Sequence, residues 1–221
     1  MRSYRSVFIS DVHLGTADCQ ADYLLDFLNK VRCQTLYLVG DIIDLIAMQR
    51  RAHFPDSHRQ VIHRLLELAA TGTRVVYIPG NHDEFFRRFC GQTFSGIELQ
   101  YKAVHTTADG RQFLVCHGDQ FDQVVRCSPL MLLVGDRAHI HSAGFLRSED
   151  GLYCNDGDWV EHCTALVERG VGKLELLHWS ESPVTLSREP EHPNPELAGH
   201  ARPVIDALPA AFLEQLNGLV R

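Results

Sequence analysis

The sequence predicts an α/β fold in which parallel and antiparallel strands share mixed sheets. In the first part of its 221 residues, short apolar runs rich in β-branched and aromatic residues alternate with helix-like patterns. Such alternation is typical of βαβ units with a largely parallel sheet. Further along the chain, glycine-containing turns separate short strand-like runs, which indicates antiparallel hairpins. We therefore expect one α/β domain with both kinds of strand pairing.

The first strands are expected from apolar runs at residues 7–9, 35–39, 74–78 and 113–116. Helices are expected between the first three runs, because apolar residues recur there at a spacing that puts them on one helical face. The apolar residues of these two helices are Leu24, Leu25, Phe27 and Leu28, and then Val61, Ile62, Leu65, Leu66 and Leu68. We interpret them as core residues.

The second part of the chain is expected to form hairpins and then a tail. The expected hairpins cover residues 104–116, 145–155 and 164–177. The domain is expected to span residues 1–182, and residues 183–221 are interpreted as a proline-rich C-terminal tail. Six of the nine prolines lie between Pro183 and Pro209, where they oppose regular structure. The tail is expected to end in a short amphipathic helix that carries Phe212, Leu213, Leu216, Leu219 and Val220 on one face.

Composition limits the classes of function. A formal charge of −7 and an isoelectric point near 6.0 argue against a broad basic surface that binds nucleic acid. The seven cysteines are scattered and never spaced C-x-x-C, which fits neither a disulfide framework nor a zinc knuckle and favours a reducing cytoplasm. The sequence contains neither a signal-peptide pattern nor a run of about 18 apolar residues. We expect a cytoplasmic protein, with peripheral contact to the inner membrane and homo-oligomer formation left open.

Polar residues of similar chemistry follow the ends of four predicted strands. The carboxyl ends of strands in an α/β sheet open into a common crevice, so residues distant in sequence converge there. One such motif alone does not indicate a site, because Gly-Asp and Gly-Asn are common turn dipeptides. Their recurrence, followed by a His-x-His pair, predicts a shared site. The residues are Asp11 and His13, Asp41 and Asp44, Asn81, His82 and Asp83, His117 and Asp119, and then His139 and His141.

The predicted set of side chains indicates a catalytic metal centre. Imidazole, carboxylate and amide oxygen without thiolate suit manganese first, with iron or zinc as alternatives, and disfavour a closed structural zinc site. Two ions about 3.5 to 4 Å apart can hold the attacking and leaving oxygens of an in-line displacement at phosphorus. Bound metal also lowers the pKa of water, so that hydroxide forms near neutral pH.

The order of the motifs resembles the calcineurin-like metallophosphoesterase superfamily. The motifs are D-x-H at 11–13, GDxxD at 40–44, GNHD at 80–83, HGD at 117–119 and H-x-H at 139–141. Within that superfamily the chain is similar to bacterial proteins of the UDP-2,3-diacylglucosamine hydrolase family, from about residue 7 to 178. The segments that carry this likeness are SDVHLGT, YLVGDIIDL, PGNHDEF, HTTADGR, HGDQFD and YCNDGDWVE.

The resemblance implies a four-layer α/β/β/α sandwich with mixed sheets and hydrolysis of a phosphate ester or pyrophosphate by a metal-bridging hydroxide. It implies a small-molecule phosphoester or a nucleotide sugar as substrate, and it makes Asp41 the bridging ligand. His82 would stabilise charge or protonate the leaving oxygen, with Asp44 orienting its ring. The implied ligands are Asp11, His13, Asp41 and His141 for one ion, and Asp41, Asn81, His117 and His139 for the other.

The chain departs from the family that it resembles at two places. Lipid A hydrolases of the family usually carry arginine where this chain has His82. The last motif has Ala138 in place of glycine, and only 21 residues separate His117 from His139 where relatives carry a longer segment with helices over the substrate. We therefore expect a preference for small, water-soluble phosphoesters over a diacylated substrate.

Other polar residues have two interpretations. Arg50, Arg51, Arg87 and Arg88 follow the second and third motifs, where they would meet substrate phosphates or form a solvated basic face. Residues 155–158 match a family signature, yet their Asn-Asp-Gly-Asp sequence fits a turn better than a ligand set. The alternatives to the proposed hydrolase are a phosphodiesterase or nuclease, and a non-catalytic metal-binding scaffold.

Overall fold

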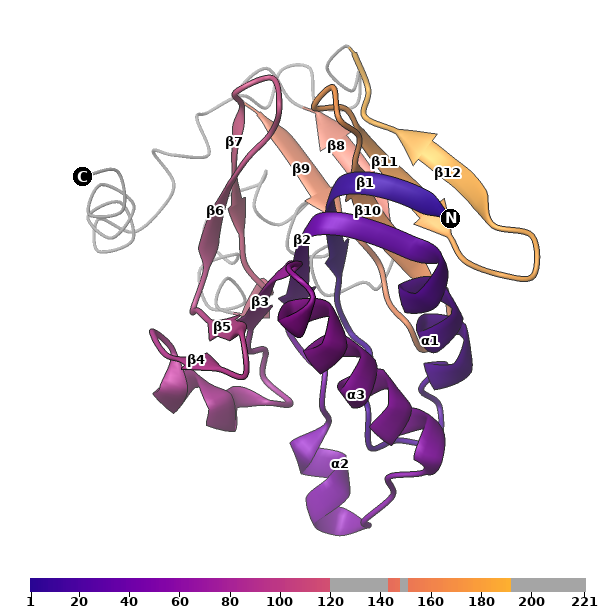
Figure 1. Ribbon diagram of the computed structural model, residues 1–221, viewed down its shortest axis with the longest axis vertical. Coiled ribbons are helices and arrows are strands. Elements are labelled where there is room, and N and C mark those ends of the chain that lie inside the picture. The colour runs from indigo at the N-terminus through magenta and orange to yellow at the C-terminus, as the bar shows by residue number, and fades with distance from the viewer. Residues whose placement is uncertain (120–142, 148–150, 192–221) are drawn as a thin grey trace.

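The computed structural model of the chain describes residues 1–119, 143–147 and 151–191. At its centre lies an eight-stranded sheet with the strand order β12-β11-β10-β1-β2-β3-β5-β4 (Figure 1). Its strands are β1 (Arg2–Ile9), β2 (Val31–Val39), β3 (Arg74–Ile78), β4 (Thr93–Phe94), β5 (Ile97–Leu99), β10 (Thr164–Glu168), β11 (Leu174–His178) and β12 (Val184–Arg188).

The sheet is mixed, as the sequence predicts. Strands β1, β2, β3 and β5 run parallel to one another, while β10, β11 and β12 add antiparallel strands on one side and β4 adds one at the other edge. In the parallel part, the carboxyl ends of β1, β2 and β3 point the same way. The loops after these three strands therefore meet at one edge of the sheet.

Two helices cover one face of the sheet (Figure 1). They are α1 (Ala21–Lys30) and α3 (Asp56–Ala70), and most of each predicted apolar stripe packs against the strands. The prediction is wrong for Leu66, which lies beside the buried row of α3 and is exposed. Because side chains alternate across a strand, every second residue of β1 to β3 joins this core. The strand residues on the helix side are Val7, Ile9, Leu36, Leu38, Val75 and Tyr77. Each large apolar side chain buried here contributes about 1.5 to 3 kcal/mol.

Two hairpins cover the opposite face and form a second β layer. One pairs β6 (Ala103–Thr106) with β7 (Gln112–Val115), and the other pairs β8 (Gly144–Arg147) with β9 (Leu152–Asn155). They bury the alternate strand residues Phe8, Tyr37, Val39, Val76, Ile78 and Leu166. The described residues thus form a helix layer and two β layers packed face to face, and they place no helix outside the hairpins.

The sequence prediction for the segment after residue 182 is wrong at its start. Residues 184–188 form β12, which pairs antiparallel with β11 and extends the sheet. Pro183 and Pro190 lie on either side of this strand and do not interrupt it, and a strand at a sheet edge needs only one hydrogen-bonded neighbour. The predicted amphipathic helix lies outside the described residues.

Two short helices follow the loops that carry the second and third motifs. They are α2 (Leu45–Arg50) and the 3-10 helix η1 (Glu84–Phe89). In the part of the chain that the structure describes, no helix is both long and apolar enough to span a lipid bilayer.

Candidate metal centre

The loops after β1 and β2 lie side by side and continue the strand pairing beyond the sheet. Asp11 N–H donates to the Gly40 carbonyl over 3.1 Å, and His13 N–H donates to the Asp41 carbonyl over 2.9 Å. Asp44 N–H in turn donates to the Leu14 carbonyl over 2.8 Å. These backbone hydrogen bonds fix the first two motifs relative to each other.

Three predicted ligands have an unusual backbone conformation. Asp11, His13 and Asp41 have φ values of 49°, 52° and 52°, in the left-handed region. This region costs a residue with a Cβ about 1 to 2 kcal/mol, although aspartate and histidine enter it more often than most. Strain of this kind persists where the surroundings hold the backbone firmly, and it is frequent at functional sites.

Glycines of the second and third motifs make room for the side chains of predicted ligands. A Cβ on Gly40 would lie 2.1 Å from His117 Nδ1, and a Cβ on Gly80 would lie 2.3 Å from Asp41 Oδ1. Both distances are far below van der Waals contact, so any other residue would displace His117 or Asp41. The GD and GN dipeptides therefore have a steric role at this site beyond turn formation.

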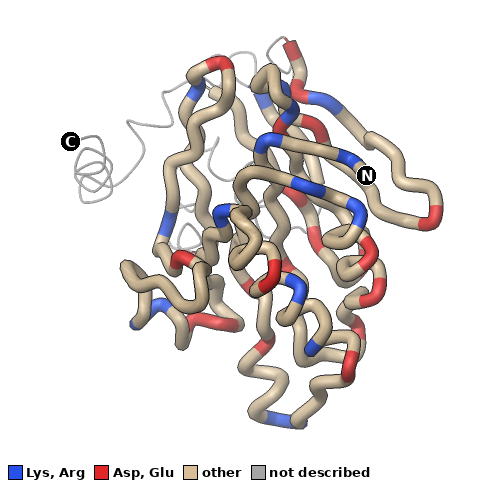
Figure 2. Tube along the Cα trace, in the orientation of Figure 1, with Lys and Arg blue, Asp and Glu red and all other residues tan. Residues whose placement is uncertain are grey.

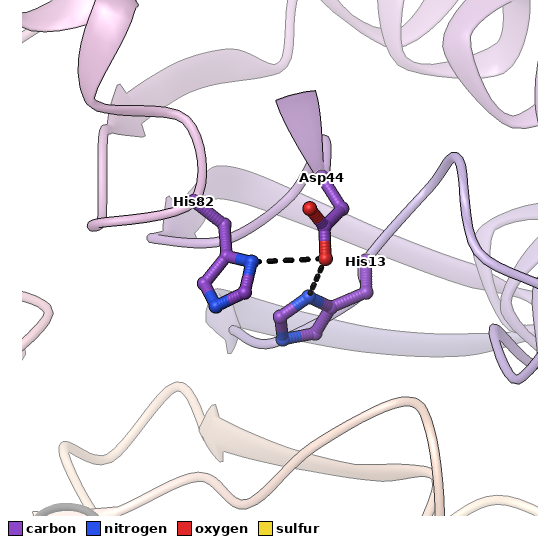
Figure 3. Close-up of side chains that lie close together, drawn as sticks. All are labelled: His13, Asp44 and His82. Atoms are coloured by element: carbon purple, nitrogen blue, oxygen red, sulfur yellow. Dashed lines mark hydrogen bonds and ion pairs between the residues drawn. The ribbon is translucent and has the colours of Figure 1, made fainter. Parts of the chain in front are cut away.

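Asp44 holds two histidines with one carboxylate oxygen (Figure 3). Its Oδ2 lies 3.0 Å from His13 Nδ1 and 2.9 Å from His82 Nδ1, while its Oδ1 accepts from Ala47 N–H over 2.7 Å and caps α2. Burial would raise the pKa of Asp44, but hydrogen bonds from Ala47, His82 and His13 lower it below its usual value. If both Nδ1 atoms donate to this carboxylate, the Nε2 of each ring carries the lone pair that can bind a metal or accept a hydrogen bond.

Asp41 lies between the imidazoles of two motifs. Its Oδ2 is 4.0 Å from His13 Nε2 and 3.5 Å from His117 Nε2, and its Oδ1 accepts from His82 N–H over 2.8 Å. Burial would raise the pKa of Asp41, but its hydrogen bond with His117 and the charge on that ring lower it. Asp11 completes a group with His13 and Asp41 in which the possible ligand atoms lie within 4.8 Å of one another.

His117 is surrounded by acids. Its Nδ1 lies 3.1 Å from the Val39 carbonyl, and its Nε2 lies 3.3 Å from Asn81 Oδ1. Burial would lower the pKa of His117, but a hydrogen bond to Asp41 and the charges of Asp11, Asp41 and Asp119 raise it to about 9. Without a metal the ring holds a proton in a region of strong negative potential, which is the property that a cation site requires.

The structure therefore brings together most of the predicted site. Imidazole, carboxylate and amide oxygen converge at one edge of the sheet, and this donor set fits Mn²⁺, Fe²⁺ or Zn²⁺. His139 and His141 lie outside the described residues. The converging residues are the predicted ligands Asp11, His13, Asp41, Asn81 and His117, with Asp44 and His82 beside them.

Asp83 and Asp119 hold the loops of the site. Asp83 is buried and accepts from Ile42 N–H over 2.9 Å and from Gly80 N–H over 2.6 Å. Asp119 forms an ion pair with Arg87, which ties η1 to the loop after β7. Arg87 thus connects the third and fourth motifs, a contact that sequence spacing could not reveal.

The other three predicted phosphate-binding arginines lie on short helices near the site. Arg50 and Arg51 are exposed at the end of α2. Arg88 is exposed on η1, and its guanidinium lies 4.4 Å from the centre of the Phe85 ring. The substrate role of these residues and of Arg87 stays a prediction.

Sequence reasoning missed Asp156, which follows β9. Asn155 and Asp158 hold turns as expected, because Asn155 Oδ1 accepts from Gly157 N–H over 2.8 Å and Asp158 Oδ1 accepts from Val160 N–H over 2.9 Å. Asp156 differs, because burial and the nearby charge of Asp11 raise its pKa to about 7. Its position directly after a strand is the same signal that identified the other site residues.

Comparison with known sequences assigns the family. The sequence profile of the calcineurin-like phosphoesterase family matches residues 4–201. The chain therefore belongs to this family, and its helix layer and two packed β layers are consistent with the metallophosphoesterase fold.

The curated relatives carry a more specific name. UDP-2,3-diacylglucosamine hydrolase of Chromohalobacter salexigens is 32% identical over 122 residues, which are 52% of this chain and 46% of that protein. The hydrolase of the same name from Ralstonia nicotianae is 30% identical over 116 residues, 51% of this chain and 42% of that protein. The chain spans about half the length of these relatives.

Two solved structures are more distantly similar. The nuclease MPE of Pseudomonas putida matches with 20% identity and a TM-score of 0.28 over 43% of this chain and 47% of that one. An archaeal phosphodiesterase matches with 14% identity and a TM-score of 0.41 over 82% of this chain and 99% of that one.

Proposed function

We propose that the chain is a dimetal hydrolase of phosphate esters or pyrophosphates. The observation that carries the proposal is the position of Asp41, whose Oδ2 lies between His13 Nε2 at 4.0 Å and His117 Nε2 at 3.5 Å. A carboxylate that bridges two ions needs ligands of both ions on its two sides. Asp11 and Asn81 add oxygen donors beside these imidazoles.

Two divalent ions, Mn²⁺ first and Fe²⁺ or Zn²⁺ as alternatives, would supply a hydroxide near neutral pH and polarise the phosphoryl group. The ligands proposed to hold them are Asp11, His13, Asp41, Asn81, His117, His139 and His141. The set combines carboxylate and amide oxygens with imidazoles and contains no thiolate, which favours a hard to borderline cation such as Mn²⁺ over a soft one.

His82 is proposed to act on the substrate directly. Its side chain is 33% exposed, whereas that of Asp44 is 5% exposed, so a substrate reaches the ring and not the carboxylate behind it. Asp44 fixes the ring by a hydrogen bond of 2.9 Å to Nδ1, which leaves Nε2 to stabilise phosphoryl charge or to transfer a proton to the leaving oxygen.

The names of the curated relatives support a nucleotide sugar or a related pyrophosphate as substrate class. A lipid substrate needs cover for its acyl chains, because each buried methylene contributes about 0.8 kcal/mol. The 21 residues between His117 and His139 leave little chain for such a cover. We therefore favour small, water-soluble substrates, and a cytoplasmic location that allows contact with the inner membrane.

The alternatives are a phosphodiesterase that acts on nucleic acid and a non-catalytic scaffold. Figure 2 shows acidic and basic residues interspersed along the described chain, and the whole chain has a formal charge of −7. This charge distribution does not favour a nucleic-acid groove. A scaffold would bind metal without turning over any phosphoester.

The test is hydrolysis by metal-free protein to which Mn²⁺ is returned. We expect turnover of p-nitrophenyl phosphate, bis-p-nitrophenyl phosphate or a UDP-sugar pyrophosphate that disappears with chelator and returns with Mn²⁺. Metal binding without turnover of any of these would favour the scaffold, and faster cleavage of single-stranded DNA would favour the nuclease.

The substrate class needs a second comparison, between a diacylated UDP-sugar and its deacylated analogue. We expect kcat/KM for the diacylated form to exceed that of the analogue by less than about tenfold, or about 1.4 kcal/mol. A larger preference would show that an acyl pocket exists, and the proposal of a water-soluble substrate would then be wrong.

A further inference from the structure

A carboxylate from the second β layer lies beside the proposed metal ligands. Asp156 follows β9 directly, and the Ser10 hydroxyl donates to its Oδ1 over 3.1 Å. The same segment is pinned to the first motif, because Trp159 N–H donates to the Asp11 carbonyl over 3.0 Å. The charges of Asp11 and His117 both act on the Asp156 carboxyl group. The acid that follows β9 is thus near proposed ligands from the loops after β1 and β7.

The second oxygen of this carboxylate has no partner in the described part of the chain. Asp156 Oδ2 is shielded from solvent and accepts no hydrogen bond there. An ionised carboxylate in this situation is strongly unfavourable, and the neighbouring Asp11 adds repulsion. A cation among these acids would remove both costs at once.

The neighbours of Asp156 in the sequence show that this is not a general property of the turn. The Asn155 oxygen accepts from Gly157 N–H over 2.8 Å, and Asp158 Oδ1 accepts from Glu161 N–H over 2.6 Å and from His162 N–H over 3.0 Å. Their side chains are used by the backbone around them. Asp156 Oδ2 is left for something outside the turn.

We propose that Asp156 is a further acidic residue of the dimetal centre, and that its Oδ2 interacts with a bound divalent cation or with a water molecule on it. The inference rests on the proposed function, because it requires a cation at the site. It assigns to this chain a carboxylate in addition to Asp11 and Asp41.

This role has two consequences of opposite sign. Replacing Asp156 with serine should weaken metal binding, because a negative charge beside the cation is lost. The same change should stabilise the metal-free protein, because a carboxylate whose Oδ2 is buried without a hydrogen-bond partner in the described part of the chain is removed. Ser10 keeps its hydrogen bond of 2.8 Å to the Gly157 carbonyl in the variant. If Asp156 only shaped the turn, its replacement would lower the unfolding temperature of both the metal-free and the metal-bound protein.

The experiment measures Mn²⁺ binding by calorimetry and thermal unfolding of the metal-free full chain. It compares wild type, Asp156→Ser, Asp156→Glu and the control Asp22→Ser, which removes an exposed carboxylate from the first turn of α1. We expect Asp156→Ser to bind Mn²⁺ about 10- to 100-fold more weakly. Its metal-free Tm should rise by about 2 to 4 °C. Asp156→Glu should retain most of the affinity, and Asp22→Ser should match wild type in affinity.

Two results would overturn the inference alone: wild-type affinity for Mn²⁺ in Asp156→Ser, or a metal-free Asp156→Ser protein that unfolds at a lower temperature than wild type. A wild-type chain that binds no Mn²⁺ would overturn the proposed function and this inference together. The wild-type arm therefore distinguishes the two failures.

Discussion

The charge of the buried acid Glu168 and the charges of the acids at the candidate metal centre are compensated in different ways. Glu168 lies between the central sheet and the β6–β7 hairpin and is fully buried. It accepts from Arg5 over 2.9 Å and from Ala108 N–H over 2.7 Å, and its Oε2 lies 2.8 Å from His105 Nε2. Tyr37 Oη lies 3.2 Å from the other nitrogen of that ring. This acid finds a cation and its hydrogen-bond donors within the chain.

The acids that follow β2 and β9 are balanced mainly by titratable rings and backbone donors. Asp41 is held by a backbone N–H and by His117, and Asp44 by two imidazoles and a backbone N–H. Imidazole becomes a cation only by taking up a proton, as the raised pKa of His117 shows. Asp156 Oδ2 is buried and accepts no hydrogen bond from the described residues.

We interpret this difference as one between an acid with a structural role and acids that are proposed to bind a cation. A buried charge that is matched inside the protein connects two layers and needs nothing else. A group of buried acids balanced mainly by titratable rings has capacity for an added cation, and the left-handed backbone of Asp11, His13 and Asp41 is consistent with a site held ready for one. Substitutions in the two groups should therefore affect different properties.

The largest effect is expected at Asp41. Asp41→Ala removes the carboxylate proposed to bridge the two ions, so we expect loss of both bound Mn²⁺ and phosphoesterase activity. Metal content by mass spectrometry and turnover of an aryl phosphate measure the two properties. Asp22→Ala, on the exposed face of α1, is the matched control. Unchanged turnover in Asp41→Ala would exclude the dimetal mechanism.

His82 should separate metal binding from chemistry. His82→Ala is expected to lower kcat by about 10²- to 10⁴-fold, the range for a lost acid or charge-stabilising group, while Mn²⁺ content stays near that of wild type. The exposed His63 on α3, with a side chain 74% exposed, provides a histidine-to-alanine control. If His82→Ala loses metal as Asp41→Ala does, then His82 is a ligand and its proposed role is wrong.

Glu168 should show the opposite pattern. Glu168→Gln leaves the Arg5 guanidinium without its buried counter-charge, and breaking such a pair costs about 3 to 5 kcal/mol of stability. Denaturant unfolding measures this loss, with exposed Glu181→Gln as control. The folded variant should keep its Mn²⁺ affinity. A variant that loses metal while keeping its stability would contradict the division between the two groups.

Sequence alone identifies the residues of the candidate metal centre better than it identifies Glu168. Asp11, Asp41, Asn81 and His117 are recognisable because polar residues that recur at successive strand ends converge at one edge of a parallel sheet. Glu168 gives no comparable signal, because it ends an apolar strand and its partners come from segments far away in the chain. Long-range pairing of this kind depends on tertiary packing.

Two other features were beyond sequence reasoning for related reasons. Asp156 lies in an Asn-Asp-Gly-Asp run that also describes an ordinary turn, and only packing against Ser10 distinguishes it from its neighbours. Strand β12 was hidden because prolines at its two ends resemble those of a loop. In both cases the local composition is compatible with two local conformations or roles. A contact with a distant segment decides between them.

The smallest effect expected is a pH dependence of the free energy of unfolding, which arises at the candidate metal centre. In the metal-free protein, burial opposes but neighbouring acids raise the pKa of His117 from its ordinary 6.5 to about 9. A raised histidine pKa stabilises the folded state below the unfolded value of 6.5, and this stability is lost as pH rises through 9. The shift corresponds to about 3 kcal/mol in total, of which roughly half should be lost between about pH 7.5 and 9.

Asp156 acts in the same direction at lower pH. Burial and Asp11 raise its pKa from 3.8 to about 7, so ionisation destabilises the folded metal-free state as pH rises through that window. Above pH 7.5 the change in stability therefore reports mainly on His117.

Bound Mn²⁺ must displace the His117 proton, so the stabilisation that Mn²⁺ provides should increase with pH. Chemical denaturation in chelator at several pH values, and in Mn²⁺ at the same values, measures both trends. His117→Gln should abolish the decline above pH 7.5, and a decline that persists in this variant would show that another group, and not the metal centre, titrates there.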